Sequence, residues 1–260
     1  MKPMEKYDIF IQAGQSNADG YGHGPAEVPY VPDERILYYT AGTPEACDYY
    51  PNSECTVQIA AERPKEGGDP EDRLGDFSLS FAQKYVEAGL LEADRKLLIV
   101  RTAVGGTGFL KHYWQVGDPL YIRMLQMTDS VLALNPENRL MGLLWHQGEH
   151  EAAFHNDPEI YHDQLKDVVQ SVRKHYEKPE LPFICGGFCD EWAQKNQPDS
   201  DIIMDVIRSV AAECGGRYIE TADLRSNNQK FGSGDEIHFC REDLQKLGRR
   251  YFDAYQQLRK

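Results

Sequence analysis

The sequence predicts an α/β protein, with helices in two layers around a mostly parallel β-sheet. Short apolar runs, typical of buried parallel strands, alternate along the 260 residues with segments of helical periodicity. Parallel strands need crossover connections, and helices usually supply them, so this alternation places helices on both faces of the sheet.

Five apolar runs carry the strand prediction, and five segments with apolar residues at three- and four-residue steps carry the helix prediction. The predicted strands cover residues 7–13, 96–102, 140–145, 182–187 and 217–221. The predicted helices cover residues 78–88, 120–134, 160–176, 202–214 and 243–258.

Residues 20–75 form a long connection rich in Gly, Pro and acidic residues, with strand-like pieces at 36–40 and 56–60. A connection of this length inside a compact domain is usually functional, so we expect it to form one wall of a substrate site. Residues 221–234 are polar and predicted as loop. With no internal repeat and no linker, the chain is expected to be one domain over residues 1–260, with a loop-rich insertion at about 20–75.

The formal net charge of −14 disfavours nucleic acid and anionic membranes as partners and favours a neutral or weakly charged substrate. No apolar run approaches 18 residues, so no transmembrane helix is expected. No signal peptide precedes the first strand, which predicts a cytoplasmic protein if Met1 is the native start, and a secreted one if a leader was removed. The sequence does not indicate an oligomeric state.

The six cysteines are too few and too scattered for a disulfide framework. Cys185 and Cys189 have a C-x-x-x-C spacing, but no second pair follows at zinc-ribbon distance. We therefore expect buried free thiols here, and no metal or other cofactor.

Four segments that contain possible catalytic residues follow predicted strands. In open α/β sheets, ligands bind at the carboxyl ends of the strands. The first is Gly14-Gln15-Ser16-Asn17, in which Gly14 allows a tight turn that exposes the Ser16 hydroxyl and its backbone N–H. An N-cap serine is the competing interpretation. In the second, paired Gly105 and Gly106 can aim backbone N–H groups at an oxyanion, or can be an ordinary turn.

The third segment, Trp145-His146-Gln147-Gly148-Glu149, ends another predicted strand. Gln147 offers a side-chain N–H donor for a tetrahedral oxyanion, and His146 and Glu149 can hold the site in place. The fourth contains Asp235 and His238, spaced so that the carboxylate can fold back and fix the imidazole tautomer. Asp-x-x-His pairs arise easily by chance. The support for this pair comes from its position after a long polar loop near the C-terminus.

Together these segments resemble the SGNH hydrolase superfamily, and within it the sialate O-acetylesterase-like and carbohydrate esterase family 6 group, which is related to acetylxylan esterases. The GQSN, GG-T, WHQGE and D-x-x-H segments occur in the family's order between residues 14 and 238. The resemblance implies a flavodoxin-like three-layer sandwich around a five-stranded parallel sheet. It also implies a carbohydrate acetylesterase acting on small-molecule or oligosaccharide acetyl esters without a cofactor.

By the same resemblance, Ser16 is the nucleophile, His238 the general base and then acid, and Asp235 the residue that orients His238. The oxyanion hole takes the Ser16 N–H, the N–H of Gly105 or Gly106, and the Gln147 side chain. Asn17, His146 and Glu149 then support the site or contact substrate. The family often continues WHQGE with a small residue and an acid, whereas this chain has His150-Glu151, which places local substrate contacts in doubt.

Two other functions compete. His146 to His150 fits the H-x-x-E-H zinc motif, which requires a helix, whereas the segment follows a predicted strand and contains Gly148. A non-catalytic carbohydrate-binding protein on the same fold is the second, with Tyr113, Trp114 and Trp145 stacking on sugars. Core packing is the ordinary role for each of these aromatic residues.

Overall fold

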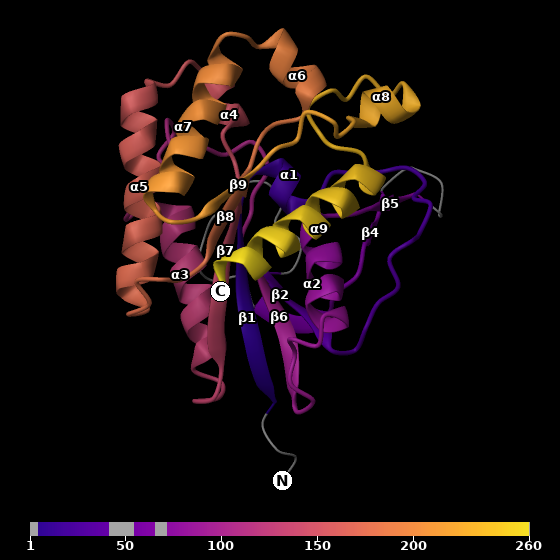
Figure 1. The fold of residues 1–260 in the computed structure, drawn as a ribbon, viewed down its shortest axis with the longest axis vertical. Coiled ribbons are helices and arrows are strands. Elements are labelled where there is room, and N and C mark those ends of the chain that lie inside the picture. Colours follow the sequence, from indigo (N-terminus) through magenta and orange to yellow (C-terminus); the bar gives the residue numbers. More distant parts are fainter. Residues whose placement is uncertain (1–4, 42–54, 66–71, 260) are drawn as a thin grey trace.

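The computed structural model describes residues 5–41, 55–65 and 72–259. Its main sheet has seven strands in the order β3-β2-β6-β1-β7-β8-β9 (Figure 1). All neighbouring pairs in it are parallel except β2–β3, which is antiparallel. Its strands are β1 (Lys6–Gly14), β2 (Ile36–Ala41), β3 (Cys55–Ile59), β6 (Arg95–Arg101), β7 (Arg139–His146), β8 (Phe183–Gly186) and β9 (Arg217–Ile219), and β4 (Arg63–Pro64) and β5 (Arg73–Leu74) form a separate ribbon.

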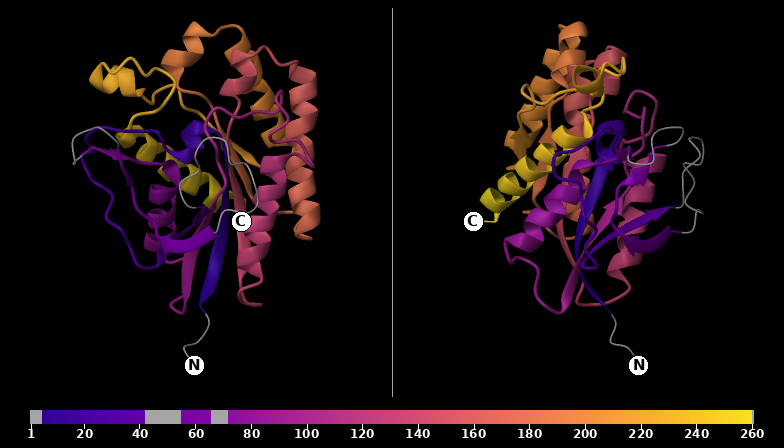
Figure 2. Two further views of the ribbon diagram at one scale, coloured as in Figure 1. Left: turned by 180° about the vertical axis from the view of Figure 1, so that it is seen from behind. Right: turned by 90° about the vertical axis from the view of Figure 1, so that its right-hand side faces the viewer.

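Helices cover both faces of the sheet. They are α1 (Ser16–Asp19), α2 (Phe77–Glu87), α3 (Pro119–Leu132), α4 (Glu149–Ala153), α5 (Pro158–His175), α6 (Asp190–Lys195), α7 (Asp199–Glu213), α8 (Asn227–Phe231) and α9 (Arg241–Leu258). Helices α2 and α9 lie on one side of β1, and α3 lies on the other (Figure 2).

Alternation along β1 explains the two layers. Successive side chains of a strand point to opposite faces of the sheet. Ile9 and Ile11 therefore join the core under α3, α5 and α7, whereas Phe10 packs edge-to-face against Phe81 of α2 and Tyr255 of α9. Ile9, Phe10 and Ile11 are all fully buried, as expected for a strand that is covered on both faces.

The predicted fold class is confirmed, with a sheet larger than expected. The five apolar runs are β1, β6, β7, β8 and β9, and the two strand-like pieces of the long connection extend the same sheet as β2 and β3. The count of five strands was too low because both pieces add to the β6 edge. The five predicted helices are α2, α3, α5, α7 and α9.

The prediction of loop over residues 221–234 was partly wrong, because α8 lies inside it. A capping box starts this helix: the Ser226 hydroxyl accepts from the Gln229 N–H, and the Gln229 side chain accepts from the Ser226 N–H. Gly232 ends the helix in the left-handed conformation. A helix of one turn is too short to show apolar periodicity. Only its capping residues, Ser226, Gln229 and Gly232, could have predicted it.

Two predictions about side chains are resolved by burial. Trp114 and Trp145 are fully buried and pack edge-to-face on each other, so neither presents a ring to a sugar. Tyr113 is partly buried against the same core. Cys185 and Cys189 are buried free thiols, as expected, and Cys47 lies outside the described residues.

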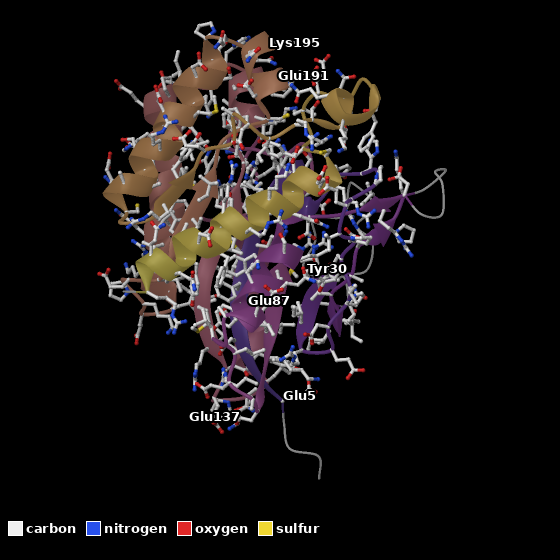
Figure 3. All side chains as sticks on the ribbon, turned by 45° about the vertical axis from the view of Figure 1, so that its right-hand side comes forward. Glu5, Tyr30, Glu87, Glu137, Glu191 and Lys195 are labelled. Atoms are coloured by element: carbon white, nitrogen blue, oxygen red, sulfur yellow. The ribbon has the colours of Figure 1, made fainter. Side chains whose placement is uncertain are left out.

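The carboxyl ends of the parallel strands meet at one end of the sheet. Glu191 and Lys195 of α6 lie at that end, and Glu5 and Glu137 lie at the opposite end (Figure 3). Glu191 Oε1 accepts from Asn228 Nδ2 at 2.7 Å, and Lys195 pairs with Glu236. Helix α6 thereby fixes the segment that carries the predicted Asp235 and His238.

Within the described part of the chain, no helix is both long and apolar enough to span a membrane.

Helices α2 and α9 cross at Gly248. A Cβ at this position would lie 1.9 Å from the Phe77 carbonyl oxygen and 2.1 Å from Ser80 Oγ. The backbones approach closely enough for Ser80 Oγ to donate to the Gln245 carbonyl at 2.8 Å. Glycine at this crossing is therefore a steric requirement.

We expect Gly248→Ala to lower the free energy of unfolding by about 2 kcal/mol, because overpacking outweighs the better helix propensity of alanine. Urea denaturation of Gly248→Ala and wild type measures the difference. Gln257→Ala, on the exposed face of α9, is the matched control and should change little. A Gly248→Ala variant as stable as wild type would contradict the steric argument.

Candidate active site

The turn that presents Ser16 is fixed by the backbone of the neighbouring strand. Gly14 has φ +129°, and a Cβ there would lie 2.1 Å from the His146 carbonyl oxygen, so only glycine fits. The next residue, Gln15, donates its N–H to that same oxygen at 3.0 Å. Gln15 Oε1 in turn accepts from the His150 N–H at 3.2 Å. The ends of β1 and β7 are thus joined just before Ser16.

Ser16 is the first residue of α1 and is only 6% exposed. Gln15, and not Ser16, occupies the N-cap position, which excludes the helix-cap interpretation of this serine. The first N–H groups of a helix have no intrahelical acceptor, so the Ser16 N–H is available to an anion. Hydroxyl and N–H therefore lie at one strand end.

Asp235 and His238 form a hydrogen-bonded pair. His238 Nδ1 lies 2.9 Å from Asp235 Oδ2 and 3.0 Å from Oδ1. Asn227 Nδ2 donates to Asp235 Oδ2 at 2.8 Å. Burial acts to raise the pKa of Asp235, but the hydrogen bonds and charge of His238, with Asn227, outweigh it and hold that pKa below its usual value. An ionised Asp235 accepts from Nδ1 of His238, which favours the tautomer with the proton on Nδ1 and leaves Nε2 without one.

Asn17 connects the serine turn to the histidine. Its Oδ1 accepts from the Phe239 N–H at 3.1 Å, and its Nδ2 donates to the Ile237 carbonyl at 3.0 Å. These two residues flank His238 in the chain. The fully buried residue after Ser16 therefore holds the backbone on both sides of His238.

Gly105 is the glycine beside Ser16. A Cβ on Gly105 would lie 3.6 Å from Ser16 Cβ and 3.3 Å from the Tyr21 hydroxyl, whereas one on Gly106 would meet nothing within 4 Å. Gly106 instead has φ +72° and makes the turn. Tyr21, 38% exposed, stacks on the His238 ring at 5.0 Å between centroids. Gly105 is thus a neighbour of Ser16 and of Tyr21, and Tyr21 is a neighbour of His238.

The Gln147 amide is buried and held at both ends. Its Nε2 donates to Glu151 Oε1 at 2.9 Å, and its Oε1 accepts from the Tyr161 hydroxyl at 3.2 Å. Glu151 also accepts from the Phe109 N–H at 2.7 Å. The amide that was predicted to donate to an oxyanion is therefore fixed relative to the segment that follows Gly105.

His146 and Glu149 lie beneath the site and do not face solvent. Both are almost completely buried, with His146 Nε2 4.0 Å from Glu149 Oε1. Glu149 Oε1 accepts from Asn17 Nδ2 at 2.8 Å, and His146 Nδ1 lies 3.0 Å from the Tyr251 hydroxyl. Burial raises the pKa of Glu149 and lowers that of His146 to about 3. His146 is thus neutral. Glu149 holds the Asn17 amide directly, and His146 packs against Glu149.

The geometry of the H-x-x-E-H segment disagrees with a zinc motif. His146 ends a strand, Gly148 has φ +146°, and His150 lies in the helix that follows. The two histidines therefore do not share a helix face, which that motif requires. Across residues 5–41, 55–65 and 72–259, no three His, Cys, Asp or Glu residues are grouped to hold a metal.

Three residues of the site were missed at the level of sequence. Tyr21 stacks on His238, Asn227 donates a hydrogen bond to Asp235, and Glu151 accepts one from Gln147. Only Glu151 carried a signal, as the acid that ends the WHQGE-x-acid pattern. Tyr21 acquires its role from contact with His238, which is far away in the chain, and Asn227 from a hydrogen bond to Asp235 across a polar segment without a recognisable motif.

A serine in a strand-to-helix turn, an Asp–His pair, and N–H donors at the carboxyl edge of a parallel sheet are the parts from which serine hydrolases are built. A family model described as "Carbohydrate esterase, sialic acid-specific acetylesterase" matches residues 6–257. The chain belongs to this family. The protein is accordingly a carbohydrate esterase, within the carboxylic ester hydrolases.

A relative from Escherichia coli (strain K12), a probable 9-O-acetyl-N-acetylneuraminic acid deacetylase, is 25% identical, with 75% of this chain and 70% of that protein covered. The crystal structure of NanS has a TM-score of 0.75 at 17% identity, covering 99% of this chain and 98% of the other. A structure from Arabidopsis thaliana has a TM-score of 0.70 at 19% identity, covering 96% and 98%. The two structures share the fold.

The burial of His146 generates a prediction about stability and pH. The unfolded chain binds a proton at this residue below pH 6.5, its ordinary value, whereas the folded protein does so only near pH 3. Stability is therefore lost as pH falls from about 6.5 toward 3. We expect urea denaturation to show that His146→Phe loses roughly 2 to 3 kcal/mol less than wild type between pH 7 and 4.5.

Glu149 titrates in both proteins, so the difference between the two stability curves isolates His146. Phenylalanine suits this position because Phe77, Phe239 and Tyr251 surround the ring. Stability curves that run parallel with pH for the two proteins would show that His146 takes up its proton at the same pH in the folded and the unfolded state. That result would contradict the lowered pKa of His146.

Proposed function

We propose that the protein removes acetyl groups from sugars by a Ser-His-Asp mechanism. His238 Nε2 takes the proton of Ser16 Oγ as Ser16 attacks the ester carbonyl, and His238 returns that proton to the departing sugar oxygen. Water, deprotonated by His238, then attacks the acetyl-enzyme and releases acetate and Ser16. Asp235 keeps His238 in the required tautomer throughout.

The observation that carries this proposal is the contact of Asn17 with the backbone on both sides of His238. Ser16 and His238 are more than 200 residues apart in the sequence, and a triad requires them to be neighbours. The two hydrogen bonds of Asn17 are made by the residue next to Ser16, so they fix the distance between the serine turn and the histidine segment. A non-catalytic sugar-binding protein has no need of this arrangement.

The proposed oxyanion hole consists of the Ser16 N–H, the Gly105 N–H and the Gln147 side chain. Gly105 is chosen over Gly106 because it is the one that lies against Ser16. The Gln147 amide has two N–H groups, and Glu151 accepts from Nε2. We propose that the other N–H points to the oxyanion.

We propose O-acetylated sialic acid as the first substrate to test, ahead of neutral acetylated sugars. The family model and the Escherichia coli relative support this order, although the net charge of −14 favours a neutral substrate. A cation lies near the site despite the negative net charge: the Arg63 guanidinium, 3.7 Å from Asp19 Oδ1, lies 5.9 Å from the centre of the Tyr21 ring, which stacks on His238. A sugar carboxylate can be accepted beside such a cation.

Ser16→Ala should reduce acetate release by several orders of magnitude, because it removes the attacking oxygen. The measurement is acetate release from 9-O-acetyl-N-acetylneuraminic acid, acetylated xylo-oligosaccharides and p-nitrophenyl acetate. Circular dichroism and melting temperature provide the folding control. Near-normal turnover by Ser16→Ala on every ester would disprove the nucleophile assignment, and turnover of xylan esters alone by wild type would reverse the substrate order.

Gln147→Ala should lower kcat by about 10²–10³-fold with KM nearly constant, because an oxyanion donor acts in the transition state and not on bound substrate. Steady-state kinetics with p-nitrophenyl acetate distinguish the two parameters. A change confined to KM would make Gln147 a substrate-binding residue.

A further inference from the structure

Glu151 is a buried carboxylate at the junction of three segments. Its Oε1 accepts from Gln147 Nε2 at 2.9 Å and from the Phe109 N–H at 2.7 Å, and its Oε2 accepts from Asn156 Nδ2 at 2.7 Å. The residue is fully buried in α4. His150 Nδ1 lies 3.5 Å from the same Oε1. A single oxygen therefore contacts both the end of β7 and the glycine-rich segment.

The first consequence concerns the orientation of the Gln147 amide. With Nε2 on Glu151 and Oε1 on the Tyr161 hydroxyl, the amide plane is held at both ends. A flipped amide would place its oxygen against the carboxylate, where two acceptors face each other without a proton. The carboxylate therefore decides which way the free N–H of Gln147 points.

The second consequence concerns the glycine-rich segment. A Cβ on Gly108 would lie 2.1 Å from Glu151 Oε1, so the backbone of this segment presses directly on the carboxylate. The hydrogen bond from the Phe109 N–H to Glu151 Oε1 fixes the position of this segment relative to the carboxylate. Gly105, which lies against Ser16, is three residues upstream in the same segment.

We propose that Glu151 is the positioning residue of the oxyanion hole, holding the Gln147 amide and the Gly105–Phe109 segment in one relative geometry. The inference rests on the proposed function. A carboxyl side chain suits the task because its two oxygens can accept from all three N–H donors at once. A glutamine of the same size would turn its own NH₂ toward one of those donors.

The test is a double-mutant cycle with Glu151→Gln, Gln147→Ala and the double variant, assayed with p-nitrophenyl acetate. Glu151→Gln should lower kcat about 10–10²-fold with KM nearly unchanged. In the Gln147→Ala background Glu151→Gln should lower kcat by a clearly smaller factor than in wild type, because one of the two groups that it positions is already gone and only the Gly105–Phe109 segment is left to disturb. Full multiplicative effects of the two changes, or an effect on KM alone, would overturn the proposal.

A matched control separates positioning from general destabilisation. Asp8→Asn removes another buried carboxylate, bonded to Arg95 and Tyr85 at the far end of β1. It should lower the melting temperature while leaving kcat unchanged below the transition. If Glu151→Gln fails to fold, Asn156→Ala, which removes only the donor to Oε2, should give a smaller kcat loss that is reduced further in the Gln147→Ala background.

Labelling of Ser16 by a fluorophosphonate distinguishes the two possible failures. No labelling of wild type, together with an active Ser16→Ala, would disprove the serine mechanism itself. Specific labelling of Ser16 with independent effects of Glu151 and Gln147 would leave the mechanism standing and disprove only the positioning role. A reversible trifluoromethyl ketone, whose oxyanion fills the hole, should bind Glu151→Gln more weakly in proportion to the loss of kcat/KM.

Discussion

The approach of Gly14 to the His146 carbonyl is the constraint on which the site depends. These two residues are opposite each other at the ends of β1 and β7, and the space between them has no room for a Cβ. The chain can turn sharply there only because glycine accepts φ +129°. Gln15 then donates to the same carbonyl, so the position of Ser16 is set by backbone atoms of the sheet.

Side chains at the same edge extend this backbone constraint in two directions. Asn17 carries it to the His238 segment, with Glu149 beneath it as acceptor. Glu151 carries it from Gln147 to the glycine-rich segment. Buried polar groups are costly unless they are paired, so each pairing also makes alternative positions of these loops unfavourable. The same hydrogen bonds thus stabilise the fold and define the geometry of the site.

The sequence was sufficient for the layout of the fold and for the segments of the site. Apolar runs predicted the strands, because strands buried on both faces consist mostly of apolar residues. Motif order singled out Ser16, Gln147, Asp235 and His238, whose catalytic roles stay predictions. The helices of one turn were missed because they carry no period. Tyr21 was missed because its contact with His238 joins residues about 200 apart, which neither spacing nor composition records. Asn227 was missed because it lies in a polar segment predicted as loop, where nothing in the sequence distinguishes it from its neighbours.

Net charge and local charge give different expectations about the substrate. A sum of −14 describes the field far from the molecule, where each charge counts equally. At contact distance only a few groups matter: Arg63 lies over the Tyr21 ring and donates to the carbonyls of Asp19 and Gly20, and Arg101 pairs with Asp19 at 3.2 Å. These cations come from β4 and β6 and meet at the edge where Ser16 lies. These groups act at contact distance, so the net charge does not describe the field at this edge, which only the folded chain assembles.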